Sequence, residues 1–253
     1  MDKHRFYIDT SGNDDDAYRE AIAYAYELAK ADPEIKRIIL LIHTKSNSTL
    51  FERLFNLEIA KKLLTTGIKA YTDHPLLKGE TKKTYSEGQN PSEIVITCGF
   101  EPDDIFRIDD FDSVKAIIAI PWLKDGIKKW VQTWAPTELR SSKVASIAYP
   151  EPPCIVKKAM QHLTDTINLS TGLNHATDEE YAKTCILALH ANEAKLDENA
   201  VGSYLISKLG WETKKAREVE KLIGTLNAGR QFKGGDRSAL QDRYNQWKKE
   251  CEE

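Results

Sequence analysis

The sequence predicts an α/β fold, with a Rossmann-like and mainly parallel sheet, followed by an all-helical part. Three observations predict this fold. Apolar, β-rich segments alternate with helix-like segments as far as Ala148, which is typical of parallel strands joined by crossover helices. A proline-rich segment, Tyr149 to Pro153, then interrupts the chain, and only helical periodicity follows it. We therefore expect two domains, residues 1–150 and residues 154–253.

The first expected elements are a strand, a helix and a second strand. Arg5 to Asp9 is apolar and aromatic and ends in a polar cluster, as a strand does before a helix cap. From Ala17 to Ala31 the apolar positions have helical spacing, and Asp32-Pro33 stops that helix. Arg37 to His43 is continuously apolar, which indicates a central strand covered on both faces.

The same alternation continues through the rest of the first part. A helix from Thr49 to Thr66 ends before Gly67, and a strand is expected from Ile68 to Thr72. A polar excursion, residues 73–92, separates it from the next strand, and the acidic stretch 101–112 is expected to be a polar connection. The remaining elements are strands Glu93 to Thr97, Val114 to Ile120 and Lys143 to Ala148, and a helix from Leu123 to Trp134.

The second part is expected to contain helices without a sheet. Its apolar positions recur at helical spacing, and no repeat of 20 to 50 residues is evident. The expected helices are Ile155 to Leu169, Asp178 to Glu193, Glu198 to Leu209, Thr213 to Asn227 and Arg237 to Glu252.

Bulk properties exclude several classes of protein. The net charge of −3 and the pI near 6.1 exclude the overall basicity of a protein that coats nucleic acid. No apolar run is long enough to cross a bilayer, and the residues after Met1 lack the apolar stretch of a signal peptide. We therefore expect a cytoplasmic protein without a membrane partner.

The four cysteines predict neither a zinc site nor a thiol enzyme. Cys98, Cys154, Cys185 and Cys251 are far apart, with no CxxC pair and no histidine at ligand spacing. Cys98 and Cys185 lie in apolar runs, so we expect them to be small buried hydrophobes in a reduced protein.

Polar side chains follow the expected strands and suggest a ligand site. In a doubly wound fold, the loops at the carboxyl ends of the strands converge on one edge, where helix N-termini attract anions. A phosphate or nucleotide site is one interpretation; simple capping of helices by the same residue types is the other. The candidate anion-binding residues are Thr10, Ser11, Asn13, Thr44, Ser46, Ser48 and Thr49.

One family resemblance supports the anion interpretation. Phe6 to Gly12, the helix that runs to Lys30, and Ile38 to His43 with the loop Thr44 to Thr49 resemble the C-terminal α/β domain of pyruvate kinases and its stand-alone relatives. The resemblance implies that Thr44, Ser46, Ser48 and Thr49 hold the phosphate of an effector. The sequence departs from the family pattern at Asn47, where a glycine is usual and allows close backbone approach.

Carboxylates at the strand ends offer an alternative site. Asp9, Asp73 and Asp103, with His74 beside them, could bind Mg²⁺ through oxygen ligands for phosphoester or nuclease chemistry. The run Ile8-Asp9-Thr10-Ser11 resembles the opening of PIN domains. Asp-rich turns are also common as solvated helix caps. His43 and His74, at strand ends, are the histidines best placed for ligand contact or acid-base chemistry.

Two helices near the C-terminus resemble a helix-turn-helix module. Glu198 to Leu209 and Thr213 to Asn227 are amphipathic and are joined by Gly210-Trp211. The segment from Lys208 to Arg237 contains eight basic and four acidic residues, so its net charge is +4. An ordinary helix pair of a bundle has the same pattern, and Trp211 is expected to be a core anchor. The candidate nucleic-acid contacts are Lys214, Lys215, Arg217, Lys221, Arg230 and Lys233.

Two functional hypotheses remain. In the first, an α/β domain senses a phosphorylated or nucleotide-like ligand and controls a helical module that contacts DNA or a protein, as in CRISPR-associated Rossmann regulators, which share this layout. A homodimer is then expected, to match two half-sites in DNA. In the second, the protein is a metal-dependent phosphoesterase or nuclease that uses the aspartates. The first needs no cofactor, and the second needs Mg²⁺.

Overall fold

A mainly parallel sheet forms the centre of the first of two compact units, and helices alone form the second. The structure, a computed structural model, describes residues 3–141, 143–144, 148–193 and 195–252. The units are Met1–Ile147 and Ala148–Glu253, so the division falls beside the proline-rich segment. The predicted fold class, a parallel α/β sheet with a helical region after it, is confirmed.

The sheet has the strand order β3-β2-β4-β5-β1-β6-β7. Neighbouring strands are parallel, except that β6 and β7 are antiparallel. The inner strands β2 and β4 are almost completely buried, because helices cover both faces of the sheet. The strands are β1 (His4–Tyr7), β2 (Arg37–Ile42), β3 (Leu76–Thr81), β4 (Glu93–Cys98), β5 (Val114–Ile120), β6 (Thr137–Glu138) and β7 (Lys143–Val144).

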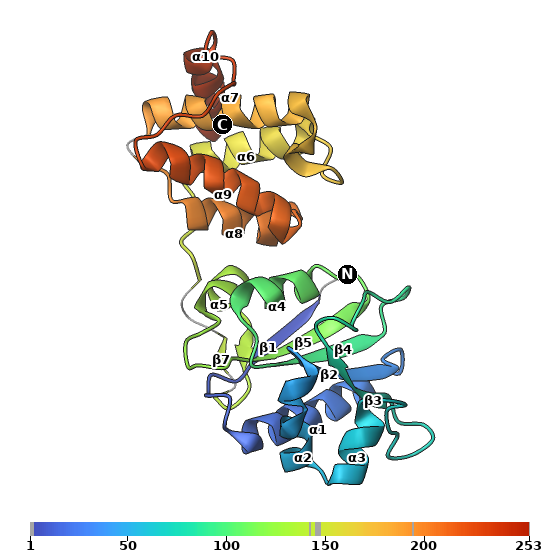
Figure 1. The fold of residues 1–253 in the computed structure, drawn as a ribbon. Helices are drawn as coiled ribbons and strands as arrows, with labels where there is room; N and C mark the ends of the chain where they lie inside the picture. Colours follow the sequence, from blue (N-terminus) through green and yellow to red (C-terminus); the bar gives the residue numbers. More distant parts are fainter. Residues whose placement is uncertain (1–2, 142, 145–147, 194, 253) are drawn as a thin grey trace. The chain divides into compact units, whose positions relative to one another are not determined.

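In the described part of this unit, helices cover both faces of the sheet. Helices α1 (Asp15–Ala31), α2 (Thr49–Leu54) and α3 (Leu57–Leu63) lie on one face, and α4 (Pro102–Asp109) and α5 (Lys128–Trp134) lie on the other (Figure 1). Helix α1 turns small alanines toward the strands, which lets its backbone come close to the sheet. The fold of this unit is therefore a three-layer α/β/α arrangement.

This topology creates two places where neighbouring strands send their helices to opposite faces. The helices that follow β1 and β2 lie on one face, and those that follow β4 and β5 lie on the other (Figure 1). Strand β2 is adjacent to β4, and β1 is adjacent to β5. Such switch points leave a crevice at the carboxyl ends of the strands, where open α/β sheets bind ligands.

The third strand lies later in the chain than predicted. The expected strand, residues 68–72, contributes only an isolated bridge between Ile68 and Leu77, and β3 is Leu76–Thr81. As the edge strand, β3 alternates buried and half-buried residues instead of being apolar throughout. At Gly79 the ring of Phe51 occupies the place of a side chain. Strand β3 was therefore missed in the sequence, because it lies within the stretch 73–92 that was expected to be a polar excursion.

Three further expectations for this unit were wrong in detail. The acidic stretch contains helix α4, with Pro102 in its first turn and Asp103 and Asp104 at its positive end. The helix expected from Thr49 to Thr66 is two helices, because Asn56 caps α3 by accepting a hydrogen bond from the Ile59 backbone N–H at 2.9 Å. Helix α5 begins only at Lys128.

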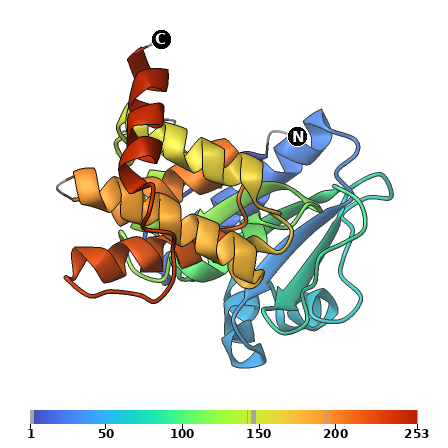
Figure 2. The ribbon, with the colours of Figure 1, turned by 90° about the horizontal axis from the view of Figure 1, so that it is seen from above.

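The second unit contains helices α6 (Cys154–Thr166), α7 (Ala176–Asn192), α8 (Glu198–Leu209), α9 (Thr213–Asn227) and α10 (Leu240–Glu252). The limits predicted for α8 and α9 are confirmed. Asp197 caps the start of α8, and Gly210 ends it in the left-handed conformation with φ of 71°. Helix α10 runs across α6 and α7 (Figure 2). Among the described residues no helix is long and apolar enough to cross a membrane.

Candidate functional site

The loop after β1 lies at the carboxyl edge of the sheet, and most of its polar groups are engaged locally. The Asp9 carboxylate accepts a hydrogen bond from the Asp125 backbone N–H at 3.0 Å. The Thr10 hydroxyl donates to Asp14 at 2.7 Å, and Asp14 caps α1 by accepting from the Ala17 N–H. Ser11 and Asn13 are exposed. In this loop the capping interpretation of the sequence describes Thr10 and Asp14 well.

Arginines at this edge are paired with carboxylates. Arg140, which follows β6, contacts Asp14 at 2.7 Å and Glu20 at 2.8 Å. Hydrogen bonds from Arg140 and Thr10 hold the pKa of Asp14 well below its usual range. Arg53 is paired with Asp15 in the same way, at 2.8 Å. Both guanidinium groups are thus engaged with carboxylates of α1 and of the loop before it.

The loop after β2 folds back on itself. Its hydroxyls at Thr44 and Ser46 lie 2.6 Å apart, and Thr44 Oγ1 also donates to the Asn47 amide oxygen at 2.8 Å. The same amide oxygen accepts from the Thr44 backbone N–H at 3.2 Å. The side chain of Asn47 thus holds the loop together. Ser48 and Thr49 lie at the junction between this turn and α2.

A group of three ionisable side chains, His43, Lys82 and Asp104, lies at the switch point between β2 and β4. His43 follows β2, Lys82 follows β3, and Asp104 lies in the first turn of α4. The Nδ1 atom of His43 is 4.0 Å from the Asp104 carboxylate, and Lys82 forms an ion pair with the same carboxylate. Asp104 therefore bridges an imidazole and an ammonium at the edge where α/β proteins bind ligands.

Backbone geometry fixes the position and tautomer of His43. Its Nε2 atom is 3.1 Å from the carbonyl oxygen of Gly99, and because a carbonyl only accepts, Nε2 carries the hydrogen. The ring stacks on buried Phe100 with 4.2 Å between centroids. The Nε2 atom of His43 therefore donates to Gly99, and Nδ1 is the ring nitrogen on the side of Asp104.

The aspartates proposed as a metal site do not meet. Because β3 begins at Leu76, Asp73 and His74 precede that strand and lie at the amino edge of the sheet, away from Asp9 and Asp103. His74 instead packs beside the rings of Tyr26 and Tyr71. Within the part of the chain that the structure describes, no three His, Cys, Asp or Glu side chains are grouped so that they could hold a metal ion. The structure thus does not bring Asp9, Asp73, His74 and Asp103 together.

A hollow of about 660 Å³ lies at the amino edge rather than at the carboxyl edge. Its wall is mostly apolar, with Leu28, Ile35 and Val114 among its residues. Lys115, at its rim, is paired with Asp32 and Glu34. Lys115 and its two carboxylates are thus engaged with one another, so the hollow offers shape but little specific chemistry.

The basic residues predicted to contact nucleic acid separate into two groups. Lys215 is half-buried and donates to the backbone oxygens of Leu169 and Ser170 at 2.8 and 2.9 Å. Arg217 pairs with buried Glu220 at 3.1 Å. These two side chains thus support the helical unit itself. The exposed members of the set are Lys214, Lys221, Arg230 and Lys233.

Close packing of α8 against α9 explains why Arg217 and Glu220 are held inside. A Cβ atom on Gly202 of α8 would lie 1.8 Å from a Glu220 carboxylate oxygen, so the absence of a side chain there makes room for the glutamate. Trp211, in the turn between the helices, is 2% exposed and donates from Nε1 to Thr164 at 2.8 Å. The expectation that Trp211 anchors the core is confirmed.

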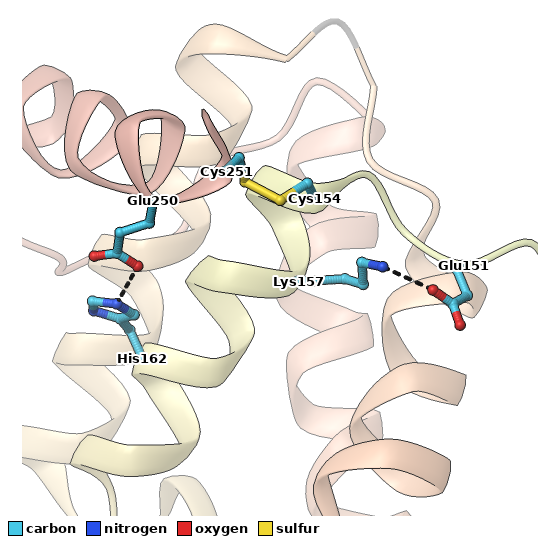
Figure 3. The surroundings of a disulfide bond; sticks show 6 residues. All are labelled: Glu151, Cys154, Lys157, His162, Glu250 and Cys251. Atoms are coloured by element: carbon cyan, nitrogen blue, oxygen red, sulfur yellow. Dashed lines mark hydrogen bonds and ion pairs between the residues drawn. A yellow bond between two sulfur atoms is a disulfide. The ribbon is translucent and has the colours of Figure 1, made fainter. Parts of the chain in front are cut away.

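Two of the four cysteines form a disulfide, so the expectation of a reduced chain was wrong. Cys154, the first residue of α6, is bonded to Cys251, near the end of α10, with 6.0 Å between their Cα atoms (Figure 3). The partners are 97 positions apart and meet only because α10 folds back across α6. Cys98 and Cys185 are buried, as predicted, and burial raises the pKa of Cys185 to about 12.

Polar contacts accompany the disulfide on both sides. Glu250, next to Cys251, accepts a hydrogen bond from His162 of α6 at 2.9 Å (Figure 3). Lys157, one turn after Cys154, pairs with Glu151 at 2.8 Å (Figure 3). Cys154 itself is exposed, so a reductant can reach the bond.

Comparison with known proteins gives one match, and it covers the helical unit. No curated protein and no solved structure matches the chain. A family model described as a domain of unknown function, DUF1889, matches residues 152–248. That segment begins two residues before α6 and ends within α10. The helical unit is therefore similar to DUF1889.

Proposed function

We propose that the chain is a ligand-sensing protein whose α/β unit binds a phosphorylated or nucleotide-like effector and whose helical unit relays that signal to DNA or to a protein partner. The observation that carries this proposal is the group His43, Lys82 and Asp104 at the switch point between β2 and β4. Side chains at this point of an open α/β sheet are in the position where ligands bind.

Lys82 is the cation best placed for an anionic ligand. Its backbone N–H donates to Ile42, so it continues the register of β3 and lies next to His43 at the end of β2. Its side chain is 41% exposed, and its described ion-pair partner is Asp104. A phosphate reaching this edge would meet the ammonium of Lys82, with the hydroxyls of Thr44 and Ser46 in the neighbouring loop. Charge-assisted hydrogen bonds make such contacts strong.

Replacement of Lys82 by methionine should weaken anion binding. The probes are inorganic phosphate, ribose 5-phosphate and the four common nucleoside monophosphates, measured by isothermal titration calorimetry on the full chain. A hydrogen bond to a charged group contributes about 1.5–3 kcal/mol, so we expect the dissociation constant of each bound probe to rise by about tenfold to hundredfold.

The matched control is Lys83→Met, which removes the same charge from the next, exposed residue. It should leave affinity nearly unchanged. Binding of no probe, or an equal loss in both variants, would contradict the proposed site.

The helical unit supplies the surface for the output. Lys214 and Lys221 are exposed and seven residues apart on α9, which places them on one side of that helix. Helix α9 is the second helix of the pair that resembles a helix-turn-helix, where a recognition helix would stand. We therefore propose Lys214 and Lys221 as DNA contacts. Lys215 and Arg217 are not among them, because their side chains are engaged within the helical unit.

Charge reversal of this pair should weaken binding to duplex DNA. In a mobility-shift titration, Lys214→Glu/Lys221→Glu should lower affinity and reduce the slope of log affinity against log salt by about 2, one unit for each phosphate that no lysine neutralises any longer. Lys248→Glu/Lys249→Glu makes the same charge change on exposed residues of α10 and serves as the control. An equal weakening in the control, or no shift at low salt, would argue for a protein partner instead.

A further inference from the structure

Trp122, directly after β5 and its following Pro121, is exposed at the carboxyl edge of the sheet. The residue is 52% exposed, and Leu123 beside it is 64% exposed. An exposed tryptophan is unusual, because it leaves a large apolar ring in water. The residue lies at the edge where open α/β sheets bind ligands, so an exposed ring at this place is in a position to contact a ligand.

Two glycines hold the ring of Trp122 in place. A Cβ atom on Gly12 would lie 2.5 Å from the Cε3 atom of the ring, and one on Gly99 would lie 3.0 Å from the same atom. Gly99 also has φ of +73°, a conformation that suits glycine. The six-membered ring of the indole therefore packs against two backbone positions that leave no room for a side chain, while about half of the residue stays exposed at 52%.

Backbone hydrogen bonds make this arrangement stable. The N–H of Gly12 donates to the carbonyl oxygen of Trp122, and the N–H of Gly99 donates to that of Ile120, both at 2.8 Å. The Asp9 carboxylate accepts from the Asp125 N–H at 3.0 Å. These bonds fasten the loop after β5 to the loops after β1 and β4. Trp122 is thus an exposed ring on a preorganised backbone, the condition that makes an aromatic contact efficient in binding.

Gly99 joins the tryptophan to the group His43, Lys82 and Asp104. The ring of Trp122 packs against Gly99, and the carbonyl oxygen of the same residue accepts the hydrogen bond from His43. An aromatic ring and a charged group are therefore linked through contacts with one glycine. A nucleotide has matching parts, because its base is a flat aromatic ring and its phosphate is an anion.

We propose that Trp122 is the stacking platform for the base of a nucleotide whose phosphate contacts Lys82. This inference rests on the proposed function and narrows it, since sugar phosphates and inorganic phosphate have no ring to stack. Stacking on an aromatic side chain tolerates any base. The ligand class is therefore the nucleotides in general. A preference for one base would come from contacts with His43 and Asp104.

The test compares nucleoside monophosphates with ribose 5-phosphate, which has the sugar and the phosphate but no base. Calorimetric titrations of the full chain use the four common nucleoside monophosphates and ribose 5-phosphate. We expect at least one nucleotide to bind wild type about tenfold tighter than ribose 5-phosphate, the lower part of the range measured for base stacking. Trp122→Leu should remove this difference and leave the affinity for ribose 5-phosphate unchanged, and Trp122→Phe should restore part of it.

Tyr71→Leu is the matched control, because Tyr71 is another exposed aromatic residue of the same unit, at 69% exposure. It should change neither affinity. If ribose 5-phosphate binds as tightly as every nucleotide, or if Trp122→Leu weakens both ligands equally, the platform is overturned while anion binding at Lys82 stands. If no probe binds wild type, the proposed function fails and the platform fails with it.

Discussion

Reduction of the Cys154–Cys251 disulfide lowers the free energy of unfolding of the helical unit by roughly 4 to 5 kcal/mol, the value that chain entropy gives for a closed loop of nearly 100 residues. The bond spans 97 positions and closes almost the whole unit. The effect should be large because α10 is otherwise weakly anchored. Among its described residues only Trp247 is buried.

Hydrogen exchange measured by mass spectrometry checks this result in the full chain, because it reports on each helix separately. After reduction, exchange should accelerate most in α10 and in the parts of α6 and α7 that α10 crosses, while β2 and β4 keep their protection. Buried Trp247 and two polar contacts, Tyr244 donating to Glu193 at 2.6 Å and His162 paired with Glu250, then remain to hold α10.

The control is the double variant Cys154→Ser/Cys251→Ser. It should match the reduced wild type, and a reductant should change it no further, because Cys98 and Cys185 are buried with raised thiol pKa values. If a thiol assay shows that Cys154 and Cys251 are reduced and hydrogen exchange in α10 is still unchanged, the helix is held by its packing and not by the bond.

The elements that the sequence predicted well are those whose signals are local. The strand Val114 to Ile120 is apolar at every position except Lys115, as expected of a strand buried on both faces, and its limits were predicted correctly. The limits of α8 follow from Asp197, which caps the helix by accepting from the Asn199 and Ala200 N–H groups, and from Gly210, which ends it. Each of these signals lies within a few residues of the element that it defines.

The elements that were missed depend on partners far away in the chain. Strand β3 is polar on one side because it is the edge of the sheet, and its pairing with β2 supplies what its sequence lacks. The disulfide joins residues that become neighbours only when α10 folds back. The group His43, Lys82 and Asp104 combines the ends of two strands with the start of α4. Because β3 was expected at residues 68–72, Lys82 was not recognised as a residue at the carboxyl end of a strand. Asp73 was placed at that edge of the sheet instead.

Replacement of Asp109 by alanine should destabilise the α/β unit by about 3 kcal/mol, because it removes one partner of a buried charge pair. The Asp109 side chain is 1% exposed. Its carboxylate accepts from Arg5 Nε at 2.9 and 3.0 Å and from Trp130 Nε1 at 2.8 Å, and Lys3 lies 3.8 Å away. The substitution leaves Arg5 and Trp130 with donors that no water can easily reach.

Urea unfolding measures the change, with Asp110→Ala as the control because it removes the next, exposed carboxylate. Asp109→Asn should have an intermediate effect, since its amide oxygen still accepts from Trp130 but its charge no longer balances Arg5. Equal stability of Asp109→Ala and the control would show that Arg5, whose guanidinium also lies 3.4 Å from the ring centre of Trp134, needs no carboxylate.

The size of this effect follows from what Asp109 connects. Arg5 belongs to β1, Trp130 to α5, and Asp109 is the last residue of α4. A single carboxylate therefore fastens both helices on one face of the sheet to a central strand. Its negative charge lies at the C-terminal end of α4, where the helix dipole disfavours it, and only the cations Arg5 and Lys3 make that position tolerable. Asp109→Ala should accordingly loosen α4 and α5 before it affects α1, which packs on the opposite face.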